Sequence, residues 1–126
     1  MNNISVFGST GFIGSRFCEL FPDKVIRQSR EGNVPHPECD ILYLISTTHN
    51  YHIYSDLNID IDTNLKKLMA VLEHCKNFKK TFNITSTWFS YGDVQLPARE
   101  DDVCNPKGFY SITKLCQESL LQTFCK

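Results

Sequence analysis

A tyrosine and a lysine lie four residues apart in the last quarter of the chain, at Tyr110 and Lys114. They fall in a segment from about 109 to 124 whose apolar residues recur every three or four positions. This spacing predicts a helix, and residues four apart lie on one face of a helix. An ammonium group beside a phenol lowers the pKa of the phenol from its usual value of about 10, so that it can exchange a proton with a substrate hydroxyl or carbonyl. The same spacing is also common in exposed pairs without a chemical role, so the interpretation depends on neighbouring groups.

Hydroxyl side chains follow an apolar segment upstream of this pair, where Ile84 precedes Thr85, Ser86 and Thr87. The segment from about 80 to 87 is predicted to be a strand. Hydroxyls at the carboxyl end of a strand can point into the crevice at that edge of a parallel sheet, where ligands bind. A hydroxyl in this place would hydrogen-bond the substrate oxygen while the phenol transfers its proton.

Three glycines follow the first apolar segment of the chain, at Gly8, Gly11 and Gly14. The residues before them predict a strand, and the residues after them predict a helix. In this context the first glycine allows a sharp turn, the second lets the backbone approach a pyrophosphate, and the third lets the helix lie close to the strand. The N-terminus of the helix adds N–H donors and a partial positive charge. The pattern predicts a dinucleotide-binding site; the alternative is a glycine-rich turn without a ligand.

Strands and helices alternate along the sequence, which predicts an α/β fold with a parallel sheet. No repeat or low-complexity linker divides the chain, so residues 1–126 are predicted to form a single domain. The apolar run at 40–45 is typical of a central strand covered on both faces. The predicted strands are 3–7, 24–28, 40–45 and 80–87, and the predicted helices are 11–21, about 56–76 and 109–124.

Each predicted helix has an apolar face. The first helix carries it at Ile13, Phe17, Leu20 and Phe21, the long central helix at Ile61, Leu65, Leu68, Leu72 and Cys75, and the last helix at Phe109, Ile112, Cys116, Leu120 and Phe124.

Composition and charge exclude several classes of partner. The chain has 126 residues, of which 41% are apolar, enough for one globular core. Thirteen basic and fourteen acidic side chains give a net charge of -1 without a long run of either sign, so no nucleic acid is expected as a partner. No apolar segment approaches the roughly 18 residues of a membrane span, and no basic leader is present. We therefore expect a cytoplasmic protein with a small-molecule substrate and no membrane partner.

The six cysteines are scattered and contain no C-x-x-C pair, so we expect reduced thiols rather than a disulfide framework. His49 and His52 lie close together but lack a companion ligand at metal-binding spacing, so they are expected to be loop residues and no metal is predicted.

Together these motifs resemble the extended short-chain dehydrogenase/reductase superfamily, which comprises nucleotide-sugar epimerases, dehydratases and reductases. The matching segments span nearly the whole chain: residues 8–14, 40–46, Asn64, 87–92, 97–100 and 106–118. The resemblance implies a Rossmann-like three-layer fold with a small parallel sheet. It makes Tyr110 the general acid and base, and makes Lys114 the group that tunes its pKa and binds the nicotinamide ribose. The catalytic serine or threonine of the family falls on Thr87, five residues before Gly92, and Ser86 is the alternative if the strand is shifted by one.

The residues after the second predicted strand favour NADP over NAD. Members that prefer NAD carry an acidic residue there to bind the ribose 2′-hydroxyl. This chain has Arg27, Ser29 and Arg30 and no acid at the matching place, and such groups would bind a 2′-phosphate by charge-assisted hydrogen bonds. The alternative is that both arginines are solvated loop residues. The full predicted cofactor-binding set is Gly8, Ser9, Thr10, Gly11, Phe12, Ile13, Gly14, Arg27, Ser29, Arg30, Leu44, Ile45, Ser46, Thr85, Tyr110 and Lys114.

The sequence departs from the family pattern in two places. Only a loop fits between the second and third predicted strands, so the fold is expected to be reduced after strand two. The chain also ends one helix after Lys114, so the C-terminal substrate subdomain is expected to be lacking, which leaves the loops 46–56 and 88–108 as local candidates for substrate contact. We therefore expect a homo-oligomer, a dimer or larger, that covers the long central helix, the C-terminal helix or the exposed sheet edge.

Two functions remain after these considerations. The first is a minimal NADP-dependent oxidoreductase or epimerase-like enzyme that uses Thr87, Tyr110 and Lys114 on an unknown carbonyl or hydroxyl substrate, including nucleotide sugars. The second is a non-catalytic NADP-binding module or regulatory subunit of a full-length relative. The intact Thr87, Tyr110 and Lys114 favour the enzyme.

Overall fold

The computed structural model describes residues 3–48, 54–77 and 79–125 of the chain. The chain divides into two compact units. Unit 1 consists of Met1–Ile45 and Lys67–Thr85, and unit 2 consists of Ser46–Lys66 and Ser86–Lys126. The single domain predicted over residues 1–126 stays a prediction. Among the described residues, no helix combines the length and the apolar character that crossing a membrane requires.

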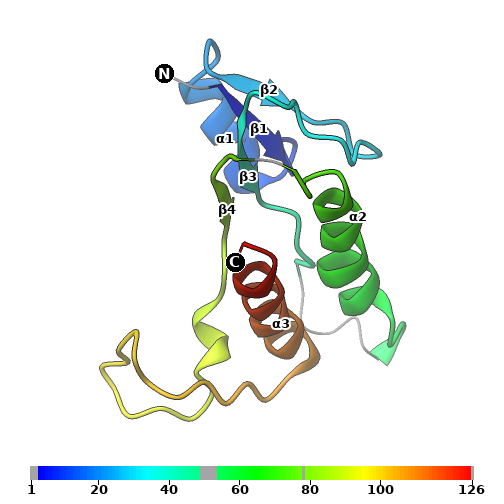
Figure 1. Cartoon of the computed structure of the whole chain (residues 1–126). Helices are drawn as coiled ribbons and strands as arrows, with labels where there is room; N and C mark the ends of the chain where they lie inside the picture. The colour runs from blue at the N-terminus through cyan, green and yellow to red at the C-terminus, as the bar shows by residue number, and fades with distance from the viewer. Residues whose placement is uncertain (1–2, 49–53, 78, 126) are drawn as a thin grey trace. The chain divides into compact units, whose positions relative to one another are not determined.

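Unit 1 contains a four-stranded parallel sheet with the strand order β2-β1-β3-β4 (Figure 1). The strands are β1 (Ile4–Phe7), β2 (Val25–Arg27), β3 (Asp40–Tyr43) and β4 (Phe82–Ile84). In the register of the sheet, Ile4 lies opposite both Val25 and Asp40. Helix α1 (Phe12–Leu20) connects β1 to β2. The α/β fold with a small parallel sheet is confirmed.

The connection from β2 to β3 is a loop without helix or strand over residues 28–39, so the predicted reduction after strand two is also confirmed. Ser5 of β1 holds this loop. Its fully buried hydroxyl accepts hydrogen bonds from the side-chain amide of Gln28 at 3.3 Å and from the backbone N–H of His36 at 3.1 Å.

The core of unit 1 is centred on β1 and β3, because each strand has neighbours on both sides. Val6 and Phe7 of β1 and Ile41 and Tyr43 of β3 are buried. The ring of Tyr43 lies between Phe7, at a centroid distance of 5.9 Å, and Phe82, at 6.1 Å. Helix α2 (Lys67–Glu73) adds the buried side chains Leu68, Val71 and Leu72.

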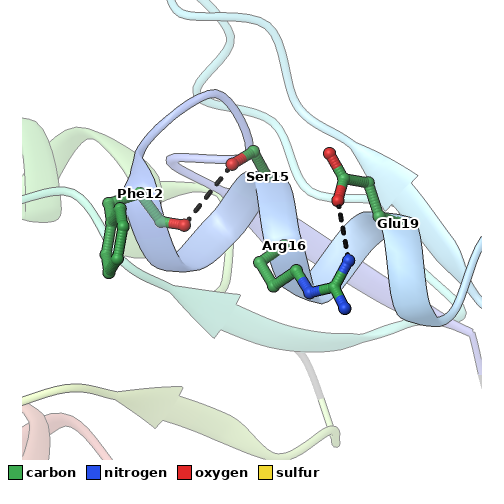
Figure 2. Close-up of polar contacts among 4 residues, drawn as sticks. All are labelled: Phe12, Ser15, Arg16 and Glu19. Atoms are coloured by element: carbon green, nitrogen blue, oxygen red, sulfur yellow. Dashed lines mark hydrogen bonds and ion pairs between the residues drawn. The ribbon is translucent and has the colours of Figure 1, made fainter.

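Helix α1 does not bury the apolar face that its sequence suggests. Its buried residues are Gly14 and Cys18, whereas Ile13, Leu20 and Phe21 are exposed. The small residues face inward because α1 approaches the preceding turn very closely at Gly14. On the exposed side Arg16 pairs with Glu19 at 3.2 Å, and the hydroxyl of Ser15 donates to the carbonyl of Phe12 (Figure 2).

Among its described residues, unit 2 includes the following helical segments. They are the π-helical segment η2 (Ile61–Lys66), the short 3₁₀ helix η3 (Trp88–Ser90) and α3 (Phe109–Phe124), and α3 contacts both η2 and η3. The predicted apolar face of α3 is partly exposed at Phe109, Ile112 and Phe124. The buried side of α3 is mostly polar and consists of Ser111, Thr113, Lys114, Gln117 and Leu121.

Candidate functional site

The turn between β1 and α1 requires glycine at two of its three glycine positions. Gly8 has a φ of +80°, in the left-handed region, and a Cβ there would lie 3.0 Å from the backbone carbonyl carbon of Leu44. A Cβ on Gly14 would lie 2.1 Å from the carbonyl oxygen of Gly8, which is closer than atoms can approach. At both positions backbone therefore packs directly against backbone, and only glycine leaves room for this close approach.

The N-terminus of α1 opens from this turn. Gly11 is the N-cap residue, and no side chain caps the helix by a hydrogen bond. The first turn of the helix has no acidic residue that would repel an anion. The backbone N–H groups and the helix dipole therefore favour a negatively charged group at this end, as the glycine pattern predicts.

The turn is braced against the end of β2 and the residue that follows it. The hydroxyl of Ser9, which is buried, donates to the carbonyl oxygen of Gln28 at 3.3 Å. The guanidinium of Arg27 donates to the carbonyl oxygen of Ser9, also at 3.3 Å. Arg27 is exposed, so its remaining N–H groups at the glycine turn are accessible to solvent and to a ligand.

The other predicted cofactor residues of unit 1 differ in how closely they approach this turn. Leu44 and Ile45 come directly after β3, and their backbone atoms lie against Gly8. Thr10, Phe12, Ser29 and Arg30 are exposed, and the structure gives the side chains of Ser29 and Arg30 no contact with the turn. Thr85 follows β4 and is half-buried, and Ser46, also half-buried, belongs to unit 2.

Tyr110 and Lys114 lie one turn apart on α3, as the spacing predicts. Tyr110 is half-buried, whereas Lys114 is only 2% exposed. Burial lowers the pKa of Lys114 to about 8, and the carboxylate of Glu118 acts in the opposite direction. A buried ammonium group is costly and requires partners. One of them is the side-chain carbonyl of Gln117, which accepts from the Nζ atom at 2.6 Å.

The two candidate hydroxyls that follow β4 have different environments. The Oγ1 atom of Thr87 accepts a hydrogen bond from the backbone N–H of Phe89 at 3.3 Å and caps η3. The hydroxyl of Ser86 is exposed and donates to the carboxylate of Glu118 on α3. The proton of Thr87 is not used in its capping bond, so this hydroxyl keeps a donor.

A buried polar network links α3 to η2, and the sequence analysis anticipated only one of its members. Asn64, matched as part of the family pattern, is fully buried. Its side-chain NH₂ group donates to the hydroxyl of Thr113 at 2.9 Å, and its side-chain carbonyl accepts from the backbone N–H of Thr47 at 2.9 Å. Gln117 was missed. Its position three residues after Lys114, on the same helical face, was the available signal.

The histidines expected in a loop, His49 and His52, lie outside the described residues. Within the described ranges, no group of three or more histidine, cysteine or acidic side chains is arranged to hold a metal ion.

Solved structures with the same fold are found for almost the whole chain. No family model matches it, and no curated protein does. RMD from Pseudomonas aeruginosa, solved with NADPH, is 21% identical over 98% of this chain and 48% of its own, with a TM-score of 0.84. UDP-glucuronic acid 4-epimerase from Bacillus cereus, solved with NAD, is 22% identical over 97% of this chain and 52% of its own, with a TM-score of 0.80. UDP-N-acetylglucosamine 4-epimerase from Methanobrevibacter ruminantium is 19% identical over 98% and 50%, with a TM-score of 0.81.

The chain thus spans about half the length of these solved proteins. At such low identity the likeness concerns the fold. It confirms the predicted fold: the chain has the Rossmann-like α/β fold that is found in about half of RMD and of each of these epimerases.

Proposed function

We propose that the chain is an NADP-binding, enzyme-like member of the extended short-chain dehydrogenase/reductase superfamily, acting on a carbonyl or hydroxyl substrate such as a nucleotide sugar. The observation that carries this proposal is the buried ammonium of Lys114, one helical turn after Tyr110. A chain that only binds a nucleotide has little need to bury a charge beside a phenol, because burial of a charged group is costly.

The fit of a dinucleotide is supported by the glycine turn, in which Gly8 and Gly14 allow close backbone packing, and by the uncapped N-terminus of α1. In this assignment Gly11 and the first amides of α1 bind the pyrophosphate, and the hydroxyls of Ser9 and Thr10 add contacts. Arg27, already at the turn, binds the 2′-phosphate. Ser29 and Arg30 are assigned to the same phosphate on sequence position alone.

The residues of unit 2 are assigned to proton transfer. The bound nicotinamide would supply or accept a hydride at the substrate carbon. Tyr110 would exchange the phenolic proton with the substrate oxygen, and the ammonium of Lys114 would stabilise the phenolate that this leaves. Thr87, with Ser86 as the alternative, would hydrogen-bond the same substrate oxygen. A cytoplasmic location stays a prediction.

The cofactor assignment is tested by fluorescence titration with NADPH and NADH on the wild type and on Arg27→Ala. NADPH should bind more tightly than NADH. Loss of one charge-assisted contact should weaken NADPH binding about tenfold and leave NADH binding unchanged. Arg16→Ala is the matched control, because Arg16 is also an exposed arginine of unit 1 but pairs with Glu19 on α1. Equal affinity for the two dinucleotides would contradict the assignment to NADP.

The catalytic assignment is tested by a carbonyl-substrate screen on the wild type and on Tyr110→Phe. Proton transfer by a positioned side chain contributes about 10²- to 10⁴-fold, so NADPH oxidation should fall by that factor, whereas NADPH affinity should fall at most about tenfold through the loss of one contact. NADPH binding without any Tyr110-dependent turnover would instead support the second function, a non-catalytic module or regulatory subunit.

A further inference from the structure

Gln117 is fully buried on α3 and contacts two groups that differ in hydrogen-bonding character. Its Oε1 atom accepts a hydrogen bond from the Nζ atom of Lys114 at 2.6 Å. Its Nε2 atom donates to the backbone carbonyl oxygen of Asn64 in η2. The side chain therefore lies between the catalytic lysine and a different helical segment.

The chemistry of these two partners determines the orientation of the Gln117 amide. An ammonium group can only donate, and a backbone carbonyl can only accept. The opposite orientation would place donor against donor and acceptor against acceptor, so a single arrangement satisfies both ends. No other uncharged side chain of this length offers an acceptor and a donor in that geometry.

Gln117 thus bridges Lys114 and the backbone carbonyl of Asn64, and Asn64 is itself held in place. The side chain of Asn64 bonds to Thr113 of α3 and, through both of its ends, to Thr47. Thr47 in turn donates to the buried carboxylate of Asp60. Several buried hydrogen bonds therefore fix the position of Asn64. Because Gln117 bonds both Asn64 and Lys114, it fixes the Nζ atom of Lys114 relative to Asn64.

We propose that Gln117 is a positioning residue that holds the ammonium of Lys114 in place and keeps it protonated for its action on Tyr110. The role of Gln117 in catalysis rests on the proposed function, whereas its hydrogen bonds to Lys114 and Asn64 do not depend on that function.

Few titratable groups lie on the described segments around Lys114. On α3 these include Tyr110, one turn before it, and Glu118, whose carboxylate raises the pKa of Lys114 while burial lowers it to about 8. The η2 side brings the buried Asp60, bonded to Thr47 and Asn64, and the exposed Asp62, which pairs with Lys66 at 2.6 Å. The segment η3 has no titratable side chain. Because an acceptor bonded to the charged form favours that form, Gln117 opposes the effect of burial.

The test is the pKa of Lys114 in two variants, measured by NMR of protein labelled with ¹³C at lysine Cε. Gln117→Met keeps the length but removes the acceptor, and should lower the pKa of Lys114 by about one unit. Gln117→Glu places a carboxylate on the ammonium and should raise it. General damage to the fold would not lower the pKa of Lys114 in one variant and raise it in the other. Gln122→Met is the matched control, because Gln122 lies on the exposed side of α3, and it should leave the pKa unchanged.

A measurement on the wild type covers the case in which a variant does not fold. The side-chain NH₂ resonances of Gln117 should shift with pH at the same midpoint as Lys114. The inference would be overturned if the Gln117 NH₂ resonances of the wild type did not shift as Lys114 titrates. It would also be overturned if Gln117→Met folded and Lys114 kept its wild-type pKa.

The test of Gln117 can fail or succeed independently of the test of the proposed function. Absence of NADPH binding and of Tyr110-dependent turnover would refute the proposed function and leave the pKa results standing. Where turnover is present, its alkaline limb should move to lower pH in Gln117→Met and to higher pH in Gln117→Glu.

Discussion

The hydroxyl of Tyr43 is a polar group in the apolar centre of unit 1. The residue is 1% exposed, and its ring packs between Phe7 and Phe82. Within the described part of the chain the hydroxyl has no hydrogen-bond partner. A buried hydroxyl that loses its bonds to water without replacing them destabilises the folded state.

We therefore expect Tyr43→Phe to raise the free energy of unfolding by about 1 kcal/mol. Burial also raises the pKa of Tyr43 above the unfolded value of about 10, so the wild type should lose stability as the pH rises above about 10, and the Phe variant should lose less. Urea unfolding at pH 7 and pH 10.5 measures both effects. Tyr54→Phe, at an exposed tyrosine, is the control and should change neither. Destabilisation by Tyr43→Phe would mean that the hydroxyl has a partner in solution.

Single residues also show where sequence reasoning reaches its limit. The spacing of Tyr110 and Lys114 was enough to place them on one face of α3. The burial of Lys114 was not predictable, because apolar periodicity identifies a buried face only where that face is apolar. The buried face of α3 is polar and is satisfied by partners 49 and 53 residues away in the sequence, as in the contacts of Thr113 and Gln117 with Asn64.

The glycine turn and α1 form one element in which backbone geometry sets what can bind. The Cβ of an alanine at position 14 would lie 2.1 Å from the carbonyl oxygen of Gly8 and 3.0 Å from the Cα of Ser9. Both are backbone atoms, so the clash cannot be relieved by a change of rotamer. Either α1 must move away from the turn or the turn must open.

Gly14→Ala should therefore weaken NADPH binding at least tenfold and lower the free energy of unfolding by about 1–3 kcal/mol. Fluorescence titration and urea unfolding measure the two effects. Ser15→Ala is the control on the same helix, since it removes only an exposed bond to the carbonyl of Phe12, and should change both little (Figure 2). Wild-type binding by the alanine variant would show that the close approach at Gly14 is not needed for the ligand.

The sequence predicted the elements more accurately than the faces they bury. All four strands lie within the predicted ranges, and α3 has the predicted bounds. Gly8 directly after β1 and Gly108 directly before α3 mark two of these boundaries in the sequence. The inward side of α1 was not recognised, because Gly14 and Cys18 give no hydrophobic signal. The long helix contains a π-helical part, η2, which the apolar spacing did not indicate.

At the scale of the whole molecule, apolar surface remains exposed on several helices. On α3 this surface consists of Phe109, Ile112 and Phe124, and on α2 Met69 is half exposed. In the sheet formed by the described residues, β4 is also an edge strand, and edge strands can pair with another chain. These are the surfaces at which we propose homo-oligomerisation.

Sedimentation equilibrium at micromolar concentration should therefore give the mass of a dimer or a larger assembly. Ile112 is 50% exposed and belongs to the apolar surface of α3, so Ile112→Ser should remove apolar contact area from the interface and shift the equilibrium toward the monomer. Leu20→Ser is the matched control, because Leu20 is similarly exposed, at 55%, but lies on α1, outside the proposed surfaces. The control should keep the wild-type mass. A well-folded wild-type monomer would contradict the prediction, and a dimer unaffected by Ile112→Ser would move the interface from α3 to α2 or to the edge of β4.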